Sequence, residues 1–133
     1  MSRGGSPFRK ARLAADIWVA YVYVRRNLTR RPLPDLVREL SAEGRPVPQV
    51  VNPPRLGRAV FKSLGIGDVR ARCISMALVH YHLLRRSGVD AELVIGLEHE
   101  PTSKDAHAWV EVQGRDVGPP PGRGDHQEMV RYP

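Results

Sequence analysis

The sequence contains one cysteine, Cys73, among its 133 residues. A single cysteine excludes a disulfide within the chain, and with no secretory signal visible this fits a reducing cytoplasm. Without paired cysteine motifs, a zinc site is not expected either. The sequence also lacks a glycine-rich phosphate loop. We therefore expect a cytoplasmic protein with no metal and no cofactor.

Long hydrophobic runs are missing as well. The longest apolar stretch, residues 13–24, is interrupted by Asp16 and is shorter than the ~20 residues that a membrane span requires. We therefore expect no membrane span. Aromatic residues make up only 6% of the chain, and the basic segments lack the interleaved aromatic side chains of a base-stacking surface. The sequence therefore gives little support to a nucleic-acid partner, and we expect none.

Acidic residues are outnumbered, with 14 Asp and Glu against 21 Lys and Arg, so the net charge is +7. Such a charge attracts acidic partners, but it does not choose among nucleic acid, anionic lipid and an acidic peptide. The simplest explanation is a basic, solubilising surface.

The length and the apolar spacing predict one domain that begins with helices. A chain of 133 residues can bury one substantial core but not two. Apolar residues at spacings of three and four predict helices over 9–28, 35–42, 56–64 and from about 73 to 86. In the first helix we expect Leu13, Ile17, Tyr21 and Val24 to share a face that Trp18 and Val22 widen. In the last helix we expect His80 on the inner side.

Strands follow the helices. Alternating apolar residues predict strands over 91–97 and 106–112, and Gln113-Gly114 predicts a tight turn into a returning strand that begins at Asp116. Helices followed by antiparallel strands are typical of the α+β class. We therefore expect a single domain over 1–133, with a helical N-terminal part (1–53) and a core (54–133) that carries the chemistry.

Cys73 opens an apolar helix, and this position is compatible with catalysis. A thiol attacks as its thiolate, and the free N–H groups of a first helical turn lower the pKa of a thiol placed there. The same N–H groups can hold the oxyanion of a tetrahedral intermediate. The alternative is that Cys73 is a small buried apolar residue that packs against the sheet.

His107 opens the second strand and is the candidate general base. Alternation places His107, Trp109 and Glu111 on one face, and the apolar residues Ala108 and Val110 on the other. The apolar face should meet the core, so His107 should face a cleft in which a base can reach a nucleophile. Trp109 is a candidate for substrate binding, with core packing as the alternative.

Several segments, taken in order, resemble a known family. They are Arg-Cys-Ile-Ser-Met-Ala-Leu (72–78), Leu-Leu-Arg-Arg-Ser-Gly-Val-Asp-Ala (83–91), Glu-Leu-Val-Ile-Gly-Leu (92–97) and Ala-His-Ala-Trp-Val-Glu-Val with a glycine turn (106–114). The set resembles the transglutaminase-like cysteine peptidases of lasso-peptide biosynthesis, most closely the stand-alone leader peptidases of the split type. The resemblance covers about residues 54–118.

The resemblance implies a papain- or transglutaminase-like core, in which the helix with the cysteine packs on a small antiparallel sheet that carries the histidine. By position, Cys73 is the nucleophile and His107 the base. The aspartate that orients the histidine in this family falls at Pro119, so Asp116 is the tentative third member and Asp125 another option. A turn at Gln113-Gly114 would pair Asp116 with Glu111, away from the histidine, unless a bulge changes the register.

The resemblance also implies the reaction and the partners. The enzyme would cleave a lasso-peptide precursor between leader and core through a thioester. It would act with a separate leader-recognition protein, and a macrocyclase would then join the freed amine of the core to an acidic side chain. The remaining alternatives are an amidase or another acyl transferase on the same scaffold, and a non-catalytic basic binding module.

Overall fold

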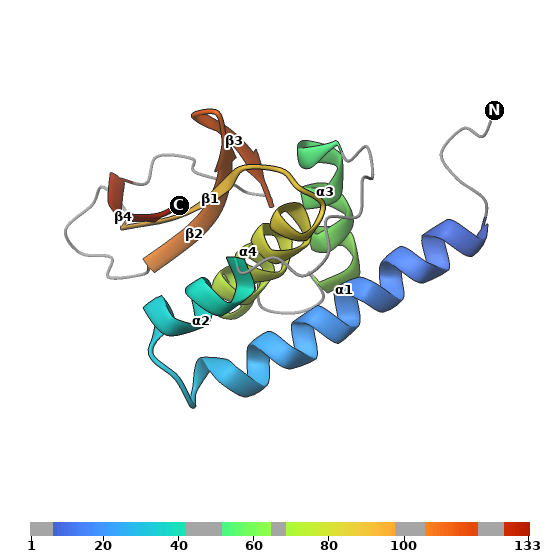
Figure 1. The fold of residues 1–133 in the computed structure, drawn as a ribbon, viewed down its shortest axis with the longest axis horizontal. Helices are drawn as coiled ribbons and strands as arrows, with labels where there is room; N and C mark the ends of the chain where they lie inside the picture. Colours follow the sequence, from blue (N-terminus) through green and yellow to red (C-terminus); the bar gives the residue numbers. More distant parts are fainter. Residues whose placement is uncertain (1–6, 42–51, 65–68, 98–105, 120–126) are drawn as a thin grey trace.

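The computed structural model describes residues 7–41, 52–64, 69–97, 106–119 and 127–133, and it shows four helices followed by four strands within them (Figure 1). The helices and strands are α1 (Pro7–Leu28), α2 (Leu33–Ser41), α3 (Pro53–Leu64), α4 (Val69–Arg86), β1 (Ala91–Leu97), β2 (Ala106–Val112), β3 (Arg115–Gly118) and β4 (Gln127–Tyr132). This order confirms the predicted α+β class.

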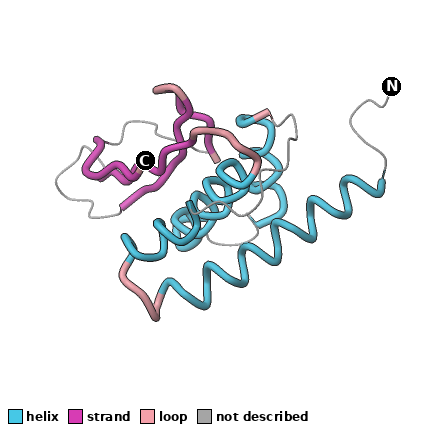
Figure 2. Tube along the Cα trace, viewed as in Figure 1, coloured by secondary structure: helices cyan, strands magenta, loops and turns pink. Residues whose placement is uncertain are grey.

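The four strands form one antiparallel sheet in the order β3-β2-β1-β4. All four helices lie on the same side of this sheet, and the tube trace separates the helical layer from the strand layer (Figure 2). Helix α4 packs on β1 and β2, while α1, α2 and α3 pack around α4. The core between the layers is aliphatic and fully buried at residues such as Leu36, Val60, Leu78, Leu84, Leu93 and Val110.

The end of α4 is fixed by its own sequence. Gly88 adopts a φ of 85°, a left-handed conformation that glycine reaches without strain. The N–H of Val89 donates to the carbonyl of Leu84 (2.9 Å), and that of Gly88 donates to the carbonyl of Arg85 (3.1 Å). These two bonds form a Schellman motif, which turns the chain sharply from α4 into β1.

Helix α3 begins three residues earlier than the apolar spacing predicts. The Asn52 side-chain carbonyl accepts a hydrogen bond from the N–H of Arg55 (3.1 Å), so Asn52 caps the helix. Pro53 then occupies the first helical position, where its missing N–H costs nothing. The cap and the proline, rather than the apolar stripe, set the start of α3.

Strand β4 is absent from the sequence-based prediction. It pairs with the free edge of β1, with Leu93 opposite Tyr132 and Val94 opposite Arg131. A register shift between Ile95 and Gly96 interrupts the pairing. As a result β1, the first strand in sequence, has a neighbour on both sides.

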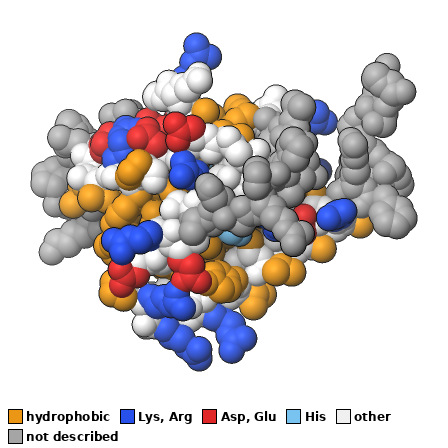
Figure 3. All heavy atoms as spheres, in the orientation of Figure 1, with side chains coloured by type: hydrophobic (Ala, Val, Ile, Leu, Met, Phe, Trp, Pro, Cys, Tyr) orange, Lys and Arg blue, Asp and Glu red, His pale blue; other side chains and the backbone are white. Residues whose placement is uncertain are grey.

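Helix α1 presents apolar side chains on its outer side as well as its inner side. Ile17 and Val24 are buried in the core as predicted, but Trp18, Val19 and Val22 are 43%, 70% and 51% exposed. The expectation that Trp18 and Val22 widen the packed face is therefore wrong. The hydrophobic surface is visible along α1 in the space-filling view (Figure 3). Among the described residues, no helix is both long and apolar enough to cross a membrane.

Candidate active site

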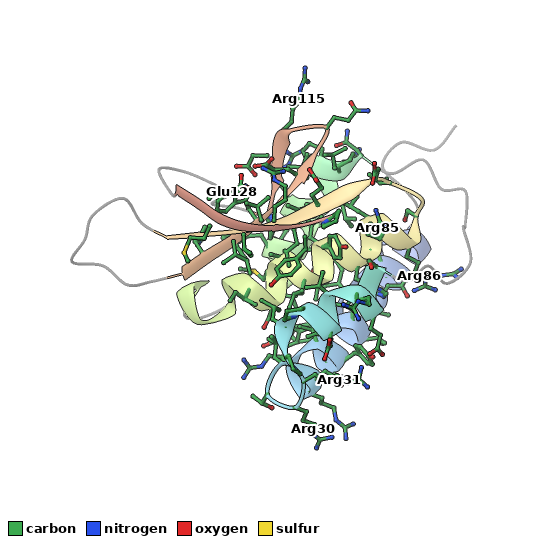
Figure 4. All side chains as sticks on the ribbon, turned by 60° about the vertical axis from the view of Figure 1, so that its left-hand side comes forward. Arg30, Arg31, Arg85, Arg86, Arg115 and Glu128 are labelled. Carbon is green, nitrogen blue, oxygen red and sulfur yellow. The ribbon has the colours of Figure 1, made fainter. Side chains whose placement is uncertain are left out.

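The topology brings the first turns of α4 and the first residues of β2 to the same end of the molecule. Only residues 87–90 join α4 to β1, so β1 runs back along the helix, and β2 is antiparallel to β1. Helix α4 and strand β2 therefore run in the same direction. Figure 4 shows this arrangement, with Arg85 and Arg86 marking the opposite end of α4.

Cys73 and His107 both lie close to this shared end. Cys73 is the fifth residue of α4, about 6 Å along the helix from Val69. His107 is the second residue of β2, about 3 Å along the strand from Ala106. The backbone thus places at one end of the fold two residues that are 34 positions apart in sequence. The side chain of Cys73 is outside the described part of the structure.

The position of Cys73 within its helix differs from the prediction. The sequence places it at the helix start, whereas α4 begins at Val69. The first-turn N–H groups, which lack helical partners, belong to the residues before Cys73. Because the effect of a helix end falls off within the first turn, the dipole supports a lowered thiol pKa less strongly than predicted.

His107 shares its face of the sheet with Trp109 and Glu111, as the alternation predicts. The opposite face carries Ala108 and Val110, which are buried in the core with the helices. The side chain of His107 is partly buried, and its Nε2 atom is shielded from solvent. His107 therefore lies on the face of the sheet opposite the one on which α4 packs.

Glycine occupies the position directly beside His107 on the neighbouring strand. Gly96 of β1 pairs with His107 in the register of the sheet. Because a glycine has no side chain, β1 contributes only backbone atoms at this register position. On the other side of Gly96 lies Glu128 of β4, which Figure 4 shows on the side of the sheet away from the helices.

Trp109 is fully buried, with 0% of its surface exposed. Its ring centroid lies 6.5 Å from that of His107, with an angle of 31° between the ring planes. The indole Nε1 donates a hydrogen bond to Oε2 of Glu111 (2.9 Å). Substrate binding by Trp109 stays a prediction, and the burial of its ring favours a role in packing.

Glu111 is a buried carboxylate that the sequence did not single out. It is only 3% exposed, and its Oε1 lies 2.9 Å from Nη1 of Arg131. Arg131 comes from β4 and also pairs with Glu92 of β1 (2.8 Å) and Glu128 of β4 (2.7 Å). Hydrogen bonds from Arg131 to Glu128, with further bonds to Glu111 and Glu92, raise the pKa of the guanidinium above its ordinary value.

Asp116 occupies the register position expected from the tight turn. Gln113 and Gly114 have φ angles of 53° and 78°, as in a type I′ hairpin turn, and Asp116 pairs with Glu111. Glu111 is four residues, or about 13 Å, from His107 along β2. The carboxylate of Asp116 accepts a hydrogen bond from the N–H of Gly118 (2.9 Å). The catalytic assignment of Asp116 stays a prediction that this register does not support, and Asp125 lies outside the described residues.

His80 is fully buried on the inner side of α4, as predicted. Its Nε2 lies 2.9 Å from the carbonyl of Pro53 at the start of α3. Burial lowers the pKa of His80 from 6.5 to about 4, and the hydrogen bond to Pro53 offsets only part of this effect. The ring is therefore neutral at neutral pH, and its Nε2–H donates to that carbonyl.

Gly57 makes the close packing around His80 possible. A Cβ atom at this position would lie 2.6 Å from the carbonyl oxygen of Val117 and 2.8 Å from Cε1 of His80. Helices α3 and α4 and strand β3 thus meet at this glycine. The absence of a side chain at Gly57 therefore allows this close packing.

A groove of about 340 Å³ lies between α1, α2 and α4. Its lining includes Val19 and Tyr23 of α1, Leu40 of α2 and Arg86 of α4. Arg86 is about 20 Å along α4 from Cys73, so the groove is separate from the candidate catalytic pair. Within the described ranges, no group of three or more His, Cys, Asp and Glu residues is placed to hold a metal ion.

One comparison with known proteins gives a match. The family model described as the transglutaminase-like superfamily matches residues 18–131, which covers most of both the helical layer and the sheet. No curated protein and no solved structure matches this chain at a significant level.

Proposed function

The chain belongs to the transglutaminase-like superfamily, and from this premise we propose that it is a cysteine peptidase that removes the leader from a lasso-peptide precursor. Members of such a superfamily characteristically pair a thiol with an imidazole in acyl-transfer chemistry. The observation that carries the proposal is the placement of Cys73 and His107 at one end of the fold by α4 and β2. The ordered segments around both residues support the leader peptidase as the substrate-level assignment.

The proposed reaction has two acyl-transfer steps. His107 takes the proton of the Cys73 thiol, and the thiolate attacks the carbonyl carbon between leader and core. The peptide C–N bond breaks as His107 returns the proton to the leaving amine of the core, and a thioester to the leader remains. Water, deprotonated by His107, then hydrolyses the thioester and frees the leader carboxylate.

The proposed partners are the leader region of the precursor, a separate leader-recognition protein and a macrocyclase. The exposed apolar side chains of α1, Trp18, Val19 and Val22, provide a surface on which the recognition protein can dock. Arg25 and Arg26 in the last turn of α1 favour an acidic border on that partner.

Mass spectrometry of the products tests the proposal. The protein is mixed with precursor and recognition protein, and the expected product is a free core peptide with a new amino terminus. Cys73→Ala and His107→Ala should each abolish cleavage and keep the circular dichroism of the wild type. His82→Gln is the matched control, because His82 is on α4 but its Nδ1 contacts the carbonyl of Leu40.

The same experiment separates the proposal from its alternatives. A transamidated precursor would identify another acyl transferase on this scaffold. Alkylation reports on the thiol directly, because Cys73 is the only cysteine of the chain. If the native protein reacts with iodoacetamide at neutral pH no faster than an ordinary thiol, then Cys73 is not activated and the enzymatic proposal fails.

A further inference from the structure

A chain of side-chain contacts leads from β4 to the candidate base through residues that the reaction itself does not use. Arg131 of β4 contacts Glu111 of β2, Glu111 accepts the hydrogen bond of the Trp109 indole, and the indole lies beside the imidazole of His107. His107, Trp109 and Glu111 occupy alternate positions of β2 and therefore share one face of the sheet.

We propose that Glu111 is a positioning residue for His107: held by Arg131, its carboxylate fixes the indole of Trp109, and the indole fixes the plane of the imidazole. This inference rests on the proposed role of His107 as the base.

The burial of Glu111 argues that its arrangement is specific. A carboxylate that is 3% exposed needs charged or hydrogen-bonding partners, because an unpaired buried charge is costly. Glu111 uses one oxygen for Arg131 and the other for Trp109. With both oxygens engaged, the carboxylate has a single orientation, and so has the indole that donates to it.

The indole, held by Glu111, in turn lies beside the imidazole of His107. A centroid distance of 6.5 Å with a tilt of 31° is within the range of interacting aromatic pairs. Gly96, the neighbour of His107 on β1, has no side chain that could support the imidazole from that strand. Within β2, Trp109 is the aromatic ring that lies beside the imidazole of His107.

Glu92 provides a matched control. It lies directly opposite Glu111 in the β1–β2 register and is also bound to Arg131, at 2.8 Å. The hydrogen bond of the indole, however, goes to Glu111. Glu92→Gln therefore removes one carboxylate from Arg131 and leaves the hydrogen bond between Trp109 and Glu111 in place.

The test compares Glu111→Leu, Glu111→Gln, Trp109→Phe and Glu92→Gln in the full chain. The first readout is the NMR titration of the His107 ring, and the second is the pH profile of Cys73 alkylation by iodoacetamide. Glu111→Leu and Trp109→Phe should shift the His107 titration and lower the alkylation rate at neutral pH about tenfold, as loss of a histidine's orienting partner does in metal sites. Glu111→Gln keeps an acceptor for the indole and should retain most of the rate, and Glu92→Gln should match the wild type.

The outcomes separate this inference from the proposed function. If wild-type Cys73 is not activated, then the proposed function fails. The positioning role is overturned under two conditions: Cys73 of the wild type is activated, and a folded Glu111→Leu or Trp109→Phe variant has the wild-type His107 titration and the wild-type rate of Cys73 alkylation. Trp109→Phe keeps an aromatic ring in the sheet, so it remains informative even where Glu111→Leu does not fold.

Discussion

Acid should destabilise this protein through His80, because its buried ring has a pKa well below the ordinary value. The ring is fully buried, and its pKa is lowered from 6.5 to about 4 by loss of solvation. The unfolded chain therefore binds a proton at a pH where the folded chain does not. Stability from this residue is complete above pH 6.5 and is lost as the pH falls from 6.5 through about 4.

The full effect is the difference between the two pKa values. From 6.5 to about 4, at about 1.4 kcal/mol per pH unit, the free energy of unfolding falls by about 3 kcal/mol. Between pH 7 and pH 4.5 the expected loss is about 2 kcal/mol, because pH 4.5 is still above the pKa of His80 in the folded state and the transition is incomplete. For a domain with a typical stability of about 5–15 kcal/mol, this is a large fraction.

Urea unfolding at several pH values measures this loss. Carboxylates also titrate in the range, so the wild type is compared with His80→Gln, which can still donate to the Pro53 carbonyl but does not titrate. The wild type should lose about 2 kcal/mol more than the variant between pH 7 and pH 4.5. Equal losses would refute the reasoning. An NMR titration of the His80 ring gives the same answer where the variant does not fold.

Three further predictions concern stability and association. Gly57→Ala should lower the free energy of unfolding by about 1–3 kcal/mol in urea titrations, because the new Cβ overlaps the carbonyl oxygen of Val117, and an unchanged midpoint would contradict this. Arg131→Leu should lower the free energy of unfolding by about 3 kcal/mol, because it leaves Glu111 buried without its cation. Adding Glu111→Leu should recover part of that loss, and a double variant with no recovery would show that the two residues are not coupled. Trp18→Glu should lower the unfolding free energy by only about 1 kcal/mol, through loss of the edge-to-face contact between Trp18 and Tyr21, yet abolish binding of the recognition protein in calorimetry; retained binding would place the docking surface elsewhere.

The strands β1 and β2 have the bounds predicted from sequence, because their signals are local. Alternating apolar residues and a Gln113-Gly114 turn are contained within a few positions of the chain. The end of α4 was also predicted from a local signal, since Gly88 adopts the left-handed conformation expected of a glycine cap. The backbone positions of Cys73 and His107 near one end of the fold follow from these same elements.

The features that sequence analysis missed depend on long-range partners. Strand β4 is stabilised by pairing with β1, 30 or more residues earlier, and the buried state of Glu111 depends on Arg131 from that strand. Residues 127–132 read Gln-Glu-Met-Val-Arg-Tyr, which does not alternate between polar and apolar residues, and no local pattern reveals which edge such a segment joins. Likewise, the outer side of α1 has the same apolar character as its inner side, so spacing alone did not separate Trp18 from Ile17.

The sheet order also constrains how this protein acquires its structure. In the β1–β2 hairpin, Glu92 stands directly opposite Glu111, and two facing negative charges oppose pairing. Arg131, which lies between these carboxylates, belongs to a strand that is synthesised later. The hairpin should therefore be a poor folding intermediate by itself, and the transition that orders it should be a single event in which β4 takes part.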